Sequence, residues 1–338
     1  TLVFSGDKVY ELAYNQTITV NDHLQANSSC NNRIEIQSTT GSPTTLSMPP
    51  SATMDVFNVR LTNVMGTGGA TFVANVSTAF GNTSGWTINL PPSRDLYWVG
   101  GSGNWNDEAH WSSTSGGAGG ECIPNVEDDV FFDANSFVPG SQAVNINGTA
   151  YCRDMDWTGA TNVPVITGSE DLYLRGSLVL IPTMTVTYTG ELHFNSRDLG
   201  NTVSLAGKTI TDKVYFDGIG GEWTLLDEFV STDYVYFYNG TLNTNGQPMT
   251  CTIFNSTTTS ARTLNLGSST ITLTGGGSAW NLNDSTNLSL NAGTSSINFF
   301  GNSSTVYFYG GHQTYHNVNF LTGASSSTTH RIYGNNTF

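Results

Sequence analysis

Short strand-like phrases recur along this chain at intervals of 20 to 26 residues, and this repetition restricts its possible folds more than any other feature. The phrase from Leu264 to Gly275 returns from Leu288 to Gly301, an offset of 24 to 26 residues. In both copies apolar residues alternate with Thr, Asn or Ser, so that one face of each strand is buried and the other is solvated. A repeat of this length with two or three strands matches one coil of a solenoid.

A second phrase, Val-aromatic-Phe, supports the same interpretation. It begins at Val214, Val235 and Val306, and its first two copies are 21 residues apart. One coil cannot bury its own inner face, so neighbouring coils must stack and continue the core. We therefore predict an all-β fold, a right-handed parallel β-solenoid (β-helix), with the hand taken from the general rule for parallel crossovers. The Leu264–Leu273 and Leu288–Phe299 phrases should pair in register as parallel neighbours.

The composition suits stacked coils. Thr and Asn at the same position of successive coils can hydrogen-bond as ladders, and the 37 Gly, with Asn, tolerate the left-handed conformations of corners. An array of β-sandwiches is the competing architecture, because it also has short strands and Gly-rich turns. It does not require phrases repeated at coil length, so we favour the solenoid.

The charge balance excludes two classes of partner. The 338 residues include 11 basic and 26 acidic side chains, a formal net charge of −15, and they form no basic stripe of the kind that binds nucleic acid. No apolar stretch is long enough to span a bilayer, so we expect no membrane insertion. The 17 Phe, 14 Tyr and 7 Trp supply a core, which argues against disorder.

A seam near residue 95 divides the chain. Pro91 and Pro92 cannot continue a strand ladder, and a segment of different composition begins at Asp95. We interpret residues 1–94 as the C-terminal part of one β-solenoid repeat unit and residues 95–338 as most of the next. The chain starts without Met and stops within a strand-like pattern, which indicates an excerpt of a longer polypeptide.

The second unit is predicted to have a Trp- and Asp-rich head over residues 95–150 and solenoid coils over residues 151–338. The head contains Trp-Val-Gly-Gly-Ser-Gly-Asn-Trp from Trp98 and Asp-Asp-Val-Phe-Phe-Asp-Ala-Asn-Ser-Phe from Asp128. These strings, with the Gly-Asn-Thr-Ser-Gly-Trp that ends at Trp86, resemble the long repeats of giant surface proteins of Bacteroidota. Those proteins are similar to the gliding-motility adhesins that type IX secretion exports.

This resemblance implies a structural or adhesive repeat segment of a large secreted adhesin, which acts in surface attachment or gliding motility. It implies an extracellular location at the bacterial cell surface. The implied partners are extracellular surfaces or glycans and the neighbouring repeats of the same chain. It transfers no catalytic residue, and it predicts that the chain is not an enzyme.

The densest aromatic cluster lies in the head and consists of Trp98, Trp105, Asp107, His110 and Trp111. Trp rings can stack on sugars, so the cluster is a candidate glycan platform. The alternative is a cap, because the open end of a solenoid core must be covered by large apolar side chains. We favour the cap and expect these Trp side chains to be buried at the join between the units.

Acidic residues are densest directly after this cluster, where Asp128, Asp129 and Asp133 are candidate Ca²⁺ ligands with Glu127 beside them. The run lacks the spacing of a calcium-binding loop, so a solvated face or a turn is the favoured interpretation. We expect Asp154 and Asp156 to point outward from a strand. No other cofactor is predicted.

Four cysteines occur, and none forms a C-x-x-C pair. Cys122 and Cys152 flank the beginning of a unit, where a cross-link would stabilise a loop-rich head, so we predict a disulfide between them. Cys30 and Cys251 resemble small buried hydrophobic residues.

Catalysis is a third interpretation, after an adhesive segment and a carbohydrate-binding module. A β-helix polysaccharide lyase or hydrolase needs clustered acidic or basic groups, and members of such a site can lie on different coils. The six histidines are scattered, apart from His312 and His316, which we place at a coil corner with Tyr315. No nucleophile, zinc-protease or phosphate-binding motif is present.

Overall fold

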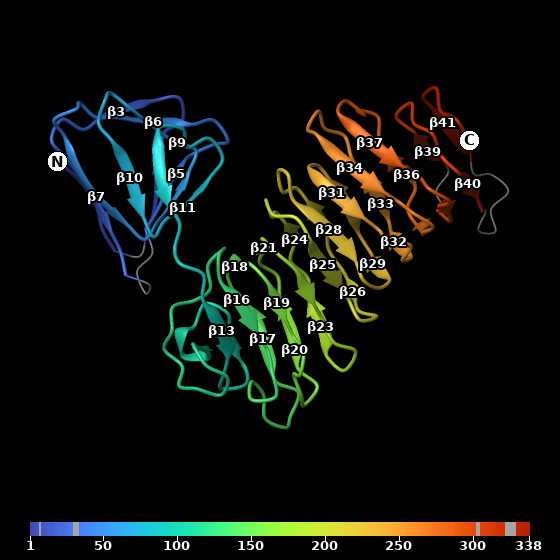
Figure 1. Cartoon of the computed structure of the whole chain (residues 1–338), viewed down its shortest axis with the longest axis horizontal. Helices are drawn as coiled ribbons and strands as arrows, with labels where there is room; N and C mark the ends of the chain where they lie inside the picture. Colours follow the sequence, from blue (N-terminus) through green and yellow to red (C-terminus); the bar gives the residue numbers. More distant parts are fainter. Residues whose placement is uncertain (7, 30–33, 302–304, 322–328) are drawn as a thin grey trace. The chain divides into compact units, whose positions relative to one another are not determined.

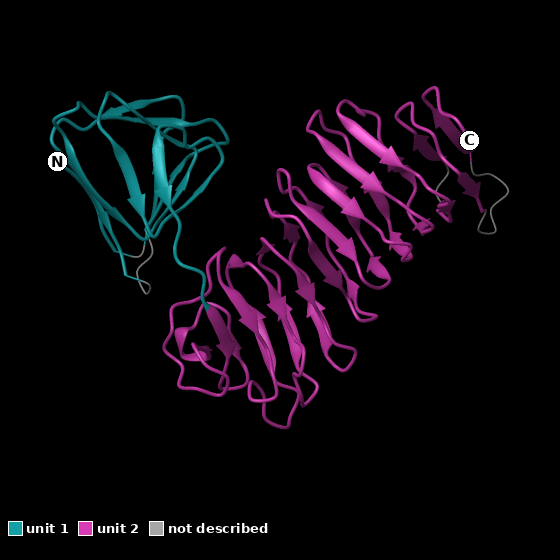
Figure 2. Ribbon diagram, in the orientation of Figure 1, with its two compact units in different colours: residues 1–94 teal, residues 95–338 magenta. Residues whose placement is uncertain are grey.

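The computed structural model describes residues 1–6, 8–29, 34–301, 305–321 and 329–338. The chain divides into two compact units, Thr1–Arg94 and Asp95–Phe338, at the boundary expected from the seam (Figures 1 and 2). Each unit is built from short strands that stack as parallel neighbours, and the fold is a β-solenoid. Across the described residues the coils make about 14 turns. The right-handed coil stays a prediction.

Unit 1 is three-sided, because each coil contributes strands to three parallel sheets. The first sheet has the order β1 (Leu2–Phe4), β4 (His23–Asn27), β7 (Thr53–Phe57), β10 (Phe72–Asn75) and β12 (Trp86–Asn89). The second has the order β11 (Thr78–Phe80), β8 (Val59–Thr62), β5 (Ile34–Ser38) and β2 (Lys8–Leu12). The third contains β3 (Thr17–Thr19), β6 (Thr44–Ser47) and β9 (Val64–Thr67).

Unit 2 is also three-sided, and its first face is one long sheet. The parallel strands of this face are β13 (Asp95–Trp98), β16 (Asp129–Phe131), β19 (Met155–Asp156), β22 (Leu178–Val179), β25 (Asn201–Ser204), β28 (Glu222–Leu225), β31 (Gly240–Asn243), β34 (Arg262–Asn265) and β37 (Leu288–Asn291). Beside β13 lies β15 (Trp111–Ser112), which pairs with it antiparallel after the short 3-10 helix Glu108–His110.

The second face of unit 2 consists of two sheets in succession. One contains β14 (Gly103–Asn104), β17 (Ala143–Ile146), β20 (Val165–Gly168) and β23 (Thr185–Tyr188). The other contains β26 (Thr209–Ile210), β29 (Phe229–Ser231), β32 (Met249–Cys251), β35 (Thr270–Leu273), β38 (Ser296–Phe299) and β40 (Asn317–Phe320).

The third face of unit 2, which carries the site described below, is one sheet. Its strands are β18 (Ala150–Cys152), β21 (Leu172–Leu174), β24 (Leu192–Phe194), β27 (Val214–Phe216), β30 (Tyr234–Phe237), β33 (Ile253–Asn255), β36 (Gly277–Asn281), β39 (Thr305–Tyr309) and β41 (Thr329–Tyr333). No helix in the described ranges has the length and apolar character needed to cross a membrane.

The repeated phrases pair as the sequence predicts. Leu264 lies opposite Leu290, and Ile271 lies opposite Ile297, in parallel register on two faces of unit 2. The prediction that these phrases are parallel neighbours is confirmed, although Leu264 lies opposite Leu290 and not opposite Leu288, the first residue of the second phrase. Register follows from burial, because a slip by one residue would turn every apolar side chain of a strand to the solvent face.

The core of unit 2 runs through the coils as columns of identical positions. On the third face one inner column contains Leu174, Phe194, Phe216 and Phe237, all of them fully buried. The rings of Phe194 and Phe216 stack with centroids 4.8 Å apart. Each such side chain stabilises the fold by about 1.5–3 kcal/mol through its removal from water.

Polar ladders hold the outer positions, as expected from the composition. Asn291 donates to the Oδ1 of Asn265 at 2.6 Å, and Asn319 donates to the Oδ1 of Asn298 at 2.8 Å. At a corner, the hydroxyl of Thr252 donates to the carbonyl oxygen of Thr232 on the preceding coil. These bonds join successive coils outside the core.

One corner shows why glycine is required. Gly293 has a φ of +57°, and a Cβ added there would lie 2.2 Å from the carbonyl oxygen of Gly267. Both the left-handed backbone and the closeness of the preceding coil therefore exclude a side chain.

The predicted disulfide between Cys122 and Cys152 is wrong. Cys122 is disulfide-bonded, whereas Cys152 has a free, fully buried thiol. The reason is the alternation of β18, which turns Cys152 inward and places it opposite Leu174 at the head of the inner column. Cys251 is buried and free, as expected, and Cys30 lies outside the described residues.

Candidate functional site

The three head tryptophans lie in the core of unit 2. Trp98, Trp105 and Trp111 are each no more than 1% exposed. Trp111 contacts the other two edge-to-face, with ring centroids 5.1 Å from Trp98 and 4.9 Å from Trp105. The indole nitrogens of Trp98 and Trp111 donate to the carbonyl oxygens of Gly101 and Trp105. Their predicted burial is confirmed, and the sugar-platform alternative is wrong because no indole face is free to stack.

The two polar members of this cluster, Asp107 and His110, also make contacts within the head. Asp107 caps the short 3-10 helix by accepting a hydrogen bond from the backbone nitrogen of Ala109. The ring of His110 stacks on Trp98 at 4.7 Å, and its Nδ1 lies 2.7 Å from the carbonyl oxygen of Val99. Asp107 therefore fixes the short helix, and His110 covers one face of Trp98.

The acidic run does not form a calcium site in the described residues. The carboxylate of Asp128 is fully buried and accepts two hydrogen bonds from Asn125, and Asp129 pairs with Arg153. Asp133 accepts from the backbone of Asn135. Protein donors occupy these carboxylates, and they belong to no group of three close ligand side chains.

The expectation of a solvated acidic face is thus corrected for Asp128 and Asp129, which are both buried. The alternative of a turn holds, since the Asp128 backbone nitrogen donates to the carbonyl oxygen of Asn125.

Asp154 and Asp156 alternate with the buried Met155 and Trp157 and therefore point outward, as expected. Asp154 is half-buried and accepts a hydrogen bond from the Ser177 backbone. Burial raises the pKa of the Asp154 carboxyl above its ordinary value.

The outer surface of the third face of unit 2 carries a feature that sequence reasoning missed. Five aromatic rings occupy one outward column, one from each of five successive strands, and we call this column the aromatic ladder: Tyr151, Tyr173, His193, Tyr215 and Tyr236. Neighbouring rings stack with centroids 5.2, 4.3, 4.4 and 4.8 Å apart. Because neighbouring strands lie about 4.8 Å apart, identical outward positions bring ring faces into contact.

Stacking determines what the aromatic ladder can offer a ligand. Ring faces inside the ladder cover one another, so the tyrosines present their edges and hydroxyl groups. Burial, with the charge of Asp171, raises the pKa of Tyr173 well above its ordinary value, and burial with the charge of Glu191 does the same for Tyr215. These hydroxyls therefore stay protonated and can donate hydrogen bonds.

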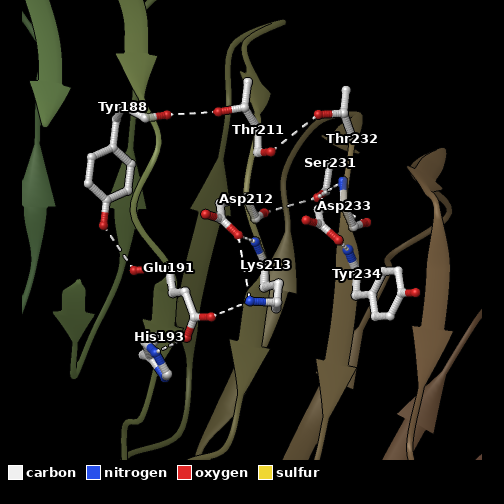
Figure 3. Close-up of polar contacts among 10 residues, drawn as sticks. All are labelled: Tyr188, Glu191, His193, Thr211, Asp212, Lys213, Ser231, Thr232, Asp233 and Tyr234. Carbon is white, nitrogen blue, oxygen red and sulfur yellow. Dashed lines mark hydrogen bonds and ion pairs between the residues drawn. The ribbon is translucent and has the colours of Figure 1, made fainter. Parts of the chain in front are cut away.

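Charged side chains flank the ladder (Figure 3). Lys213 donates to the Oε1 of Glu191 at 2.5 Å. Partial burial acts to raise the pKa of Glu191, but the hydrogen bond and charge of Lys213 outweigh it, and the pKa lies below its usual value. Glu191 is therefore ionised at neutral pH.

His193 lies at the centre of this charged group, and Figure 3 shows the Glu191 carboxylate between its ring and Lys213. Its Nε2 lies 3.6 Å from the Oε2 of Glu191, and its Nδ1 lies 3.6 Å from the Oδ2 of Asp217. The residue is 9% exposed, and neither ring nitrogen has a hydrogen-bond partner. Among the described residues, Asp171, Glu191 and His193 are brought together as possible metal ligands, with their ligand atoms within 4.8 Å of one another.

The signal for this ladder was present in the sequence. The five ladder residues are 20 to 22 residues apart, which is the coil length. Tyr215 and Tyr236 are the central residues of the Val-Tyr-Phe phrases, and the same outward position on the preceding coils holds His193, Tyr173 and Tyr151. His193 looks isolated in the sequence because its partners come from other coils.

Near the C-terminal end of unit 2, a shallow depression is lined by side chains of β37 and the segment before β40. Its titratable groups are Tyr315 and His316. Tyr315 is buried, and its hydroxyl donates to the carbonyl oxygen of Gly310. Among the described residues that line this depression there is no pair of carboxylates of the kind that cleaves glycosides.

Comparison with protein-family models, curated proteins and solved structures gave no match to this chain.

Proposed function

We propose that this chain is a structural and adhesive segment of a large secreted cell-surface protein that acts in surface attachment or gliding motility. One observation carries the proposal. Most successive coils of unit 2 pair in register, apart from one irregularity between Gly277 and Trp280, and their outer positions form columns of Asn, Thr and Tyr. A chain built in this way offers many similar contacts along its length.

Stiffness supports this role. Each coil pairs with the next on up to three faces, and one apolar core continues from Leu96 to Tyr315. Bending such a stack would open ladder hydrogen bonds and expose apolar side chains to water. A stiff stack of coils is suited to hold a binding surface away from a cell.

An extracellular location is supported by the chemistry of the cysteines. Cys122 is disulfide-bonded, and structural disulfides persist mainly in oxidising compartments. The free thiols of Cys152 and Cys251 are fully buried. Only 11% of the residues are charged, and the outer columns carry Asn and Thr, a composition that suits contact with hydrated surfaces or glycans.

Adhesion is tested with beads coated with the chain and held under flow on glass, polystyrene and immobilised glycans. We expect retention above that of beads coated with the heat-unfolded chain. Retention equal to that control on every surface would contradict an adhesive role.

A carbohydrate-binding module is the second candidate, and the hydroxyl edges of the aromatic ladder favour it. Tyr173 and Tyr215 present protonated hydroxyls beside the carboxylates of Asp171 and Glu191, a mixture of donors and acceptors that suits sugar hydroxyls. A glycan array separates the candidates. One glycan class bound tightly by the monomeric chain supports a module, whereas weak binding to many surfaces supports the adhesive segment. Release of reducing sugar from acidic polysaccharides would instead reveal an enzyme.

A further inference from the structure

We propose that Asp171, Glu191 and His193, on the outer surface of the third face of unit 2, bind a divalent transition-metal ion, with Zn²⁺ as the best match. The site does not depend on the proposed adhesive function. Asp171 directly precedes β21 and Glu191 directly precedes β24, so the sheet pairing of these strands places their carboxylates on neighbouring coils. His193 is the outward central residue of β24.

The ring nitrogens of His193 lack hydrogen-bond partners, and this favours a bound ion. Burial of a polar group without a hydrogen bond is unfavourable, and both ring nitrogens of this buried residue lack one. The ring is held between Tyr173 and Tyr215 at 4.3 and 4.4 Å, so it cannot swing out to water without breaking two stacked pairs. A bound ion would satisfy the nitrogen that faces Glu191.

The distances fit a tetrahedral ion better than a hydrogen bond. The 3.6 Å between His193 Nε2 and Glu191 Oε2 exceeds the usual hydrogen-bond length. With Zn²⁺ bonds of about 2.0–2.1 Å, two ligand atoms at a tetrahedral angle are roughly 3.3 Å apart. A small rotation of the Glu191 carboxylate therefore closes the site around an ion.

Asp217 supplies the partner that metal-binding histidines generally have. A metal-ligating imidazole usually directs its second nitrogen at a carboxylate, which fixes the ring orientation and increases its basicity. The Oδ2 of Asp217, directly after β27, lies 3.6 Å from the Nδ1 of His193, so a hydrogen bond between them needs a small movement of the Asp217 side chain. The ion and its support would thus connect three successive coils.

The ligand set selects the class of ion. Ca²⁺ and Mg²⁺ are held by oxygen ligands, whereas a set of one imidazole and two carboxylates suits Zn²⁺ and related transition metals. Lys213 opposes binding, because its ammonium occupies the Oε1 of Glu191 and adds positive charge. The fourth position of a tetrahedral ion would be filled by water, since three protein ligands are present.

The test is calorimetric titration of the untagged chain, first stripped with a chelator, with Zn²⁺. We expect one ion per chain and a rise in the thermal unfolding midpoint that the chelator reverses. Failure of the wild-type chain to bind Zn²⁺ below about 1 mM would overturn the proposal.

Variants localise the ion. His193→Phe keeps a ring stacked between the two tyrosines but removes the nitrogen ligand, and it should abolish stoichiometric binding, as should Asp171→Asn. Asp217→Asn should weaken binding by about 10–100-fold. Lys213→Gln should strengthen it, an increase that general loss of folding cannot produce.

His316→Gln is the matched control, because this exposed histidine lies away from the site and its loss should leave the affinity unchanged. Unchanged binding in His193→Phe would place the ion elsewhere and overturn the assignment. Displacement of Zn²⁺ by equimolar Ca²⁺ would also overturn it, because it would indicate a site made only of oxygen atoms.

Discussion

Unit 2 uses aromatic side chains in two contrasting ways. In the cap, Trp98, Trp105 and Trp111 are buried and meet edge-to-face. In the aromatic ladder, the rings of Tyr215 and its neighbours stack nearly parallel, and the tyrosines stay partly exposed. The difference follows from the backbone, because regular coils repeat the same side-chain direction every 4.8 Å or so, whereas the head has no such repeat.

This contrast separates stability from surface chemistry. The cap rings come from a segment that does not repeat, and they cover the end of the core. No equivalent side chain on a neighbouring coil can fill the space that one of them leaves. The ladder rings lie over a core that is already closed by Phe194, Phe216 and Phe237. Aromatic residues of the cap should therefore control folding, and those of the ladder should control what the surface binds.

The largest expected effect is at the cap. Trp105→Ala should lower the free energy of unfolding of unit 2 by about 3–5 kcal/mol, because it leaves a large cavity beside Trp111. Urea unfolding followed by circular dichroism measures the change. A loss below about 1 kcal/mol would show that the head does not close the core.

The next effect concerns a charged residue that occupies a core column. Arg262 is 3% exposed, and its guanidinium donates to the carbonyl oxygens of Ser256, Ser260, Asp284 and Thr286. Arg262→Met should cost about 3 kcal/mol, because these buried acceptors lose their donors. The exposed Arg197→Met is the control and should stay within about 0.5 kcal/mol of wild type. Equal effects of the two changes would contradict this account of Arg262.

A smaller effect is expected in the ladder. Tyr215→Ala removes stacking on His193 and Tyr236 and should cost about 1–2 kcal/mol in unfolding free energy. Beads coated with the Tyr215→Ala chain should lose more retention on glycan-coated surfaces than beads coated with the folded fraction of the Trp105→Ala chain. The reverse order of retention would remove the distinction between the two aromatic groups.

The smallest effect is expected for the polar ladders. Asn291→Ala deletes one exposed hydrogen bond to Asn265 and should cost about 0.5 kcal/mol. The corner change Gly293→Ala provides the comparison, since a Cβ there meets the Gly267 carbonyl. Gly293→Ala should lower the free energy of unfolding several-fold more than Asn291→Ala. Thermal unfolding of both variants ranks them directly.

The period of the sequence was sufficient to predict the fold and much of the register. Apolar alternation excludes a slip by one residue, which would turn Leu264 to solvent. It does not choose between Leu288 and Leu290 as the partner of Leu264, and the observed partner, Leu290, has the same 26-residue offset that joins Ile271 to Ile297.

The same alternation also decides the side of the strand on which Cys152 lies. Ala150-Tyr-Cys aligns with Leu172-Tyr-Leu, so alternation predicts an inward thiol and excludes the bridge to Cys122.

Other features depend on contacts that no local pattern contains. Arg262 occupies an inward position aligned with Leu288, and its partners come from two separate loops. The ligands around His193 come from different coils, and only the pairing of β21, β24 and β27 brings them together. The acidic run of Asp128 and Asp129 resembles a cation site only as a string of letters, because Asn125 hydrogen-bonds to Asp128 and Arg153 pairs with Asp129.

We propose that the chain attaches to surfaces through many weak contacts along its stacked coils. The most direct test of this claim is the dependence of bead retention under flow on the surface density of the folded chain. Multivalent attachment predicts retention that rises more steeply than linearly with density, while the monomeric chain in solution binds the same surface weakly. Retention that is linear in density, together with tight saturable binding by the monomer, would contradict the claim and identify a single binding site.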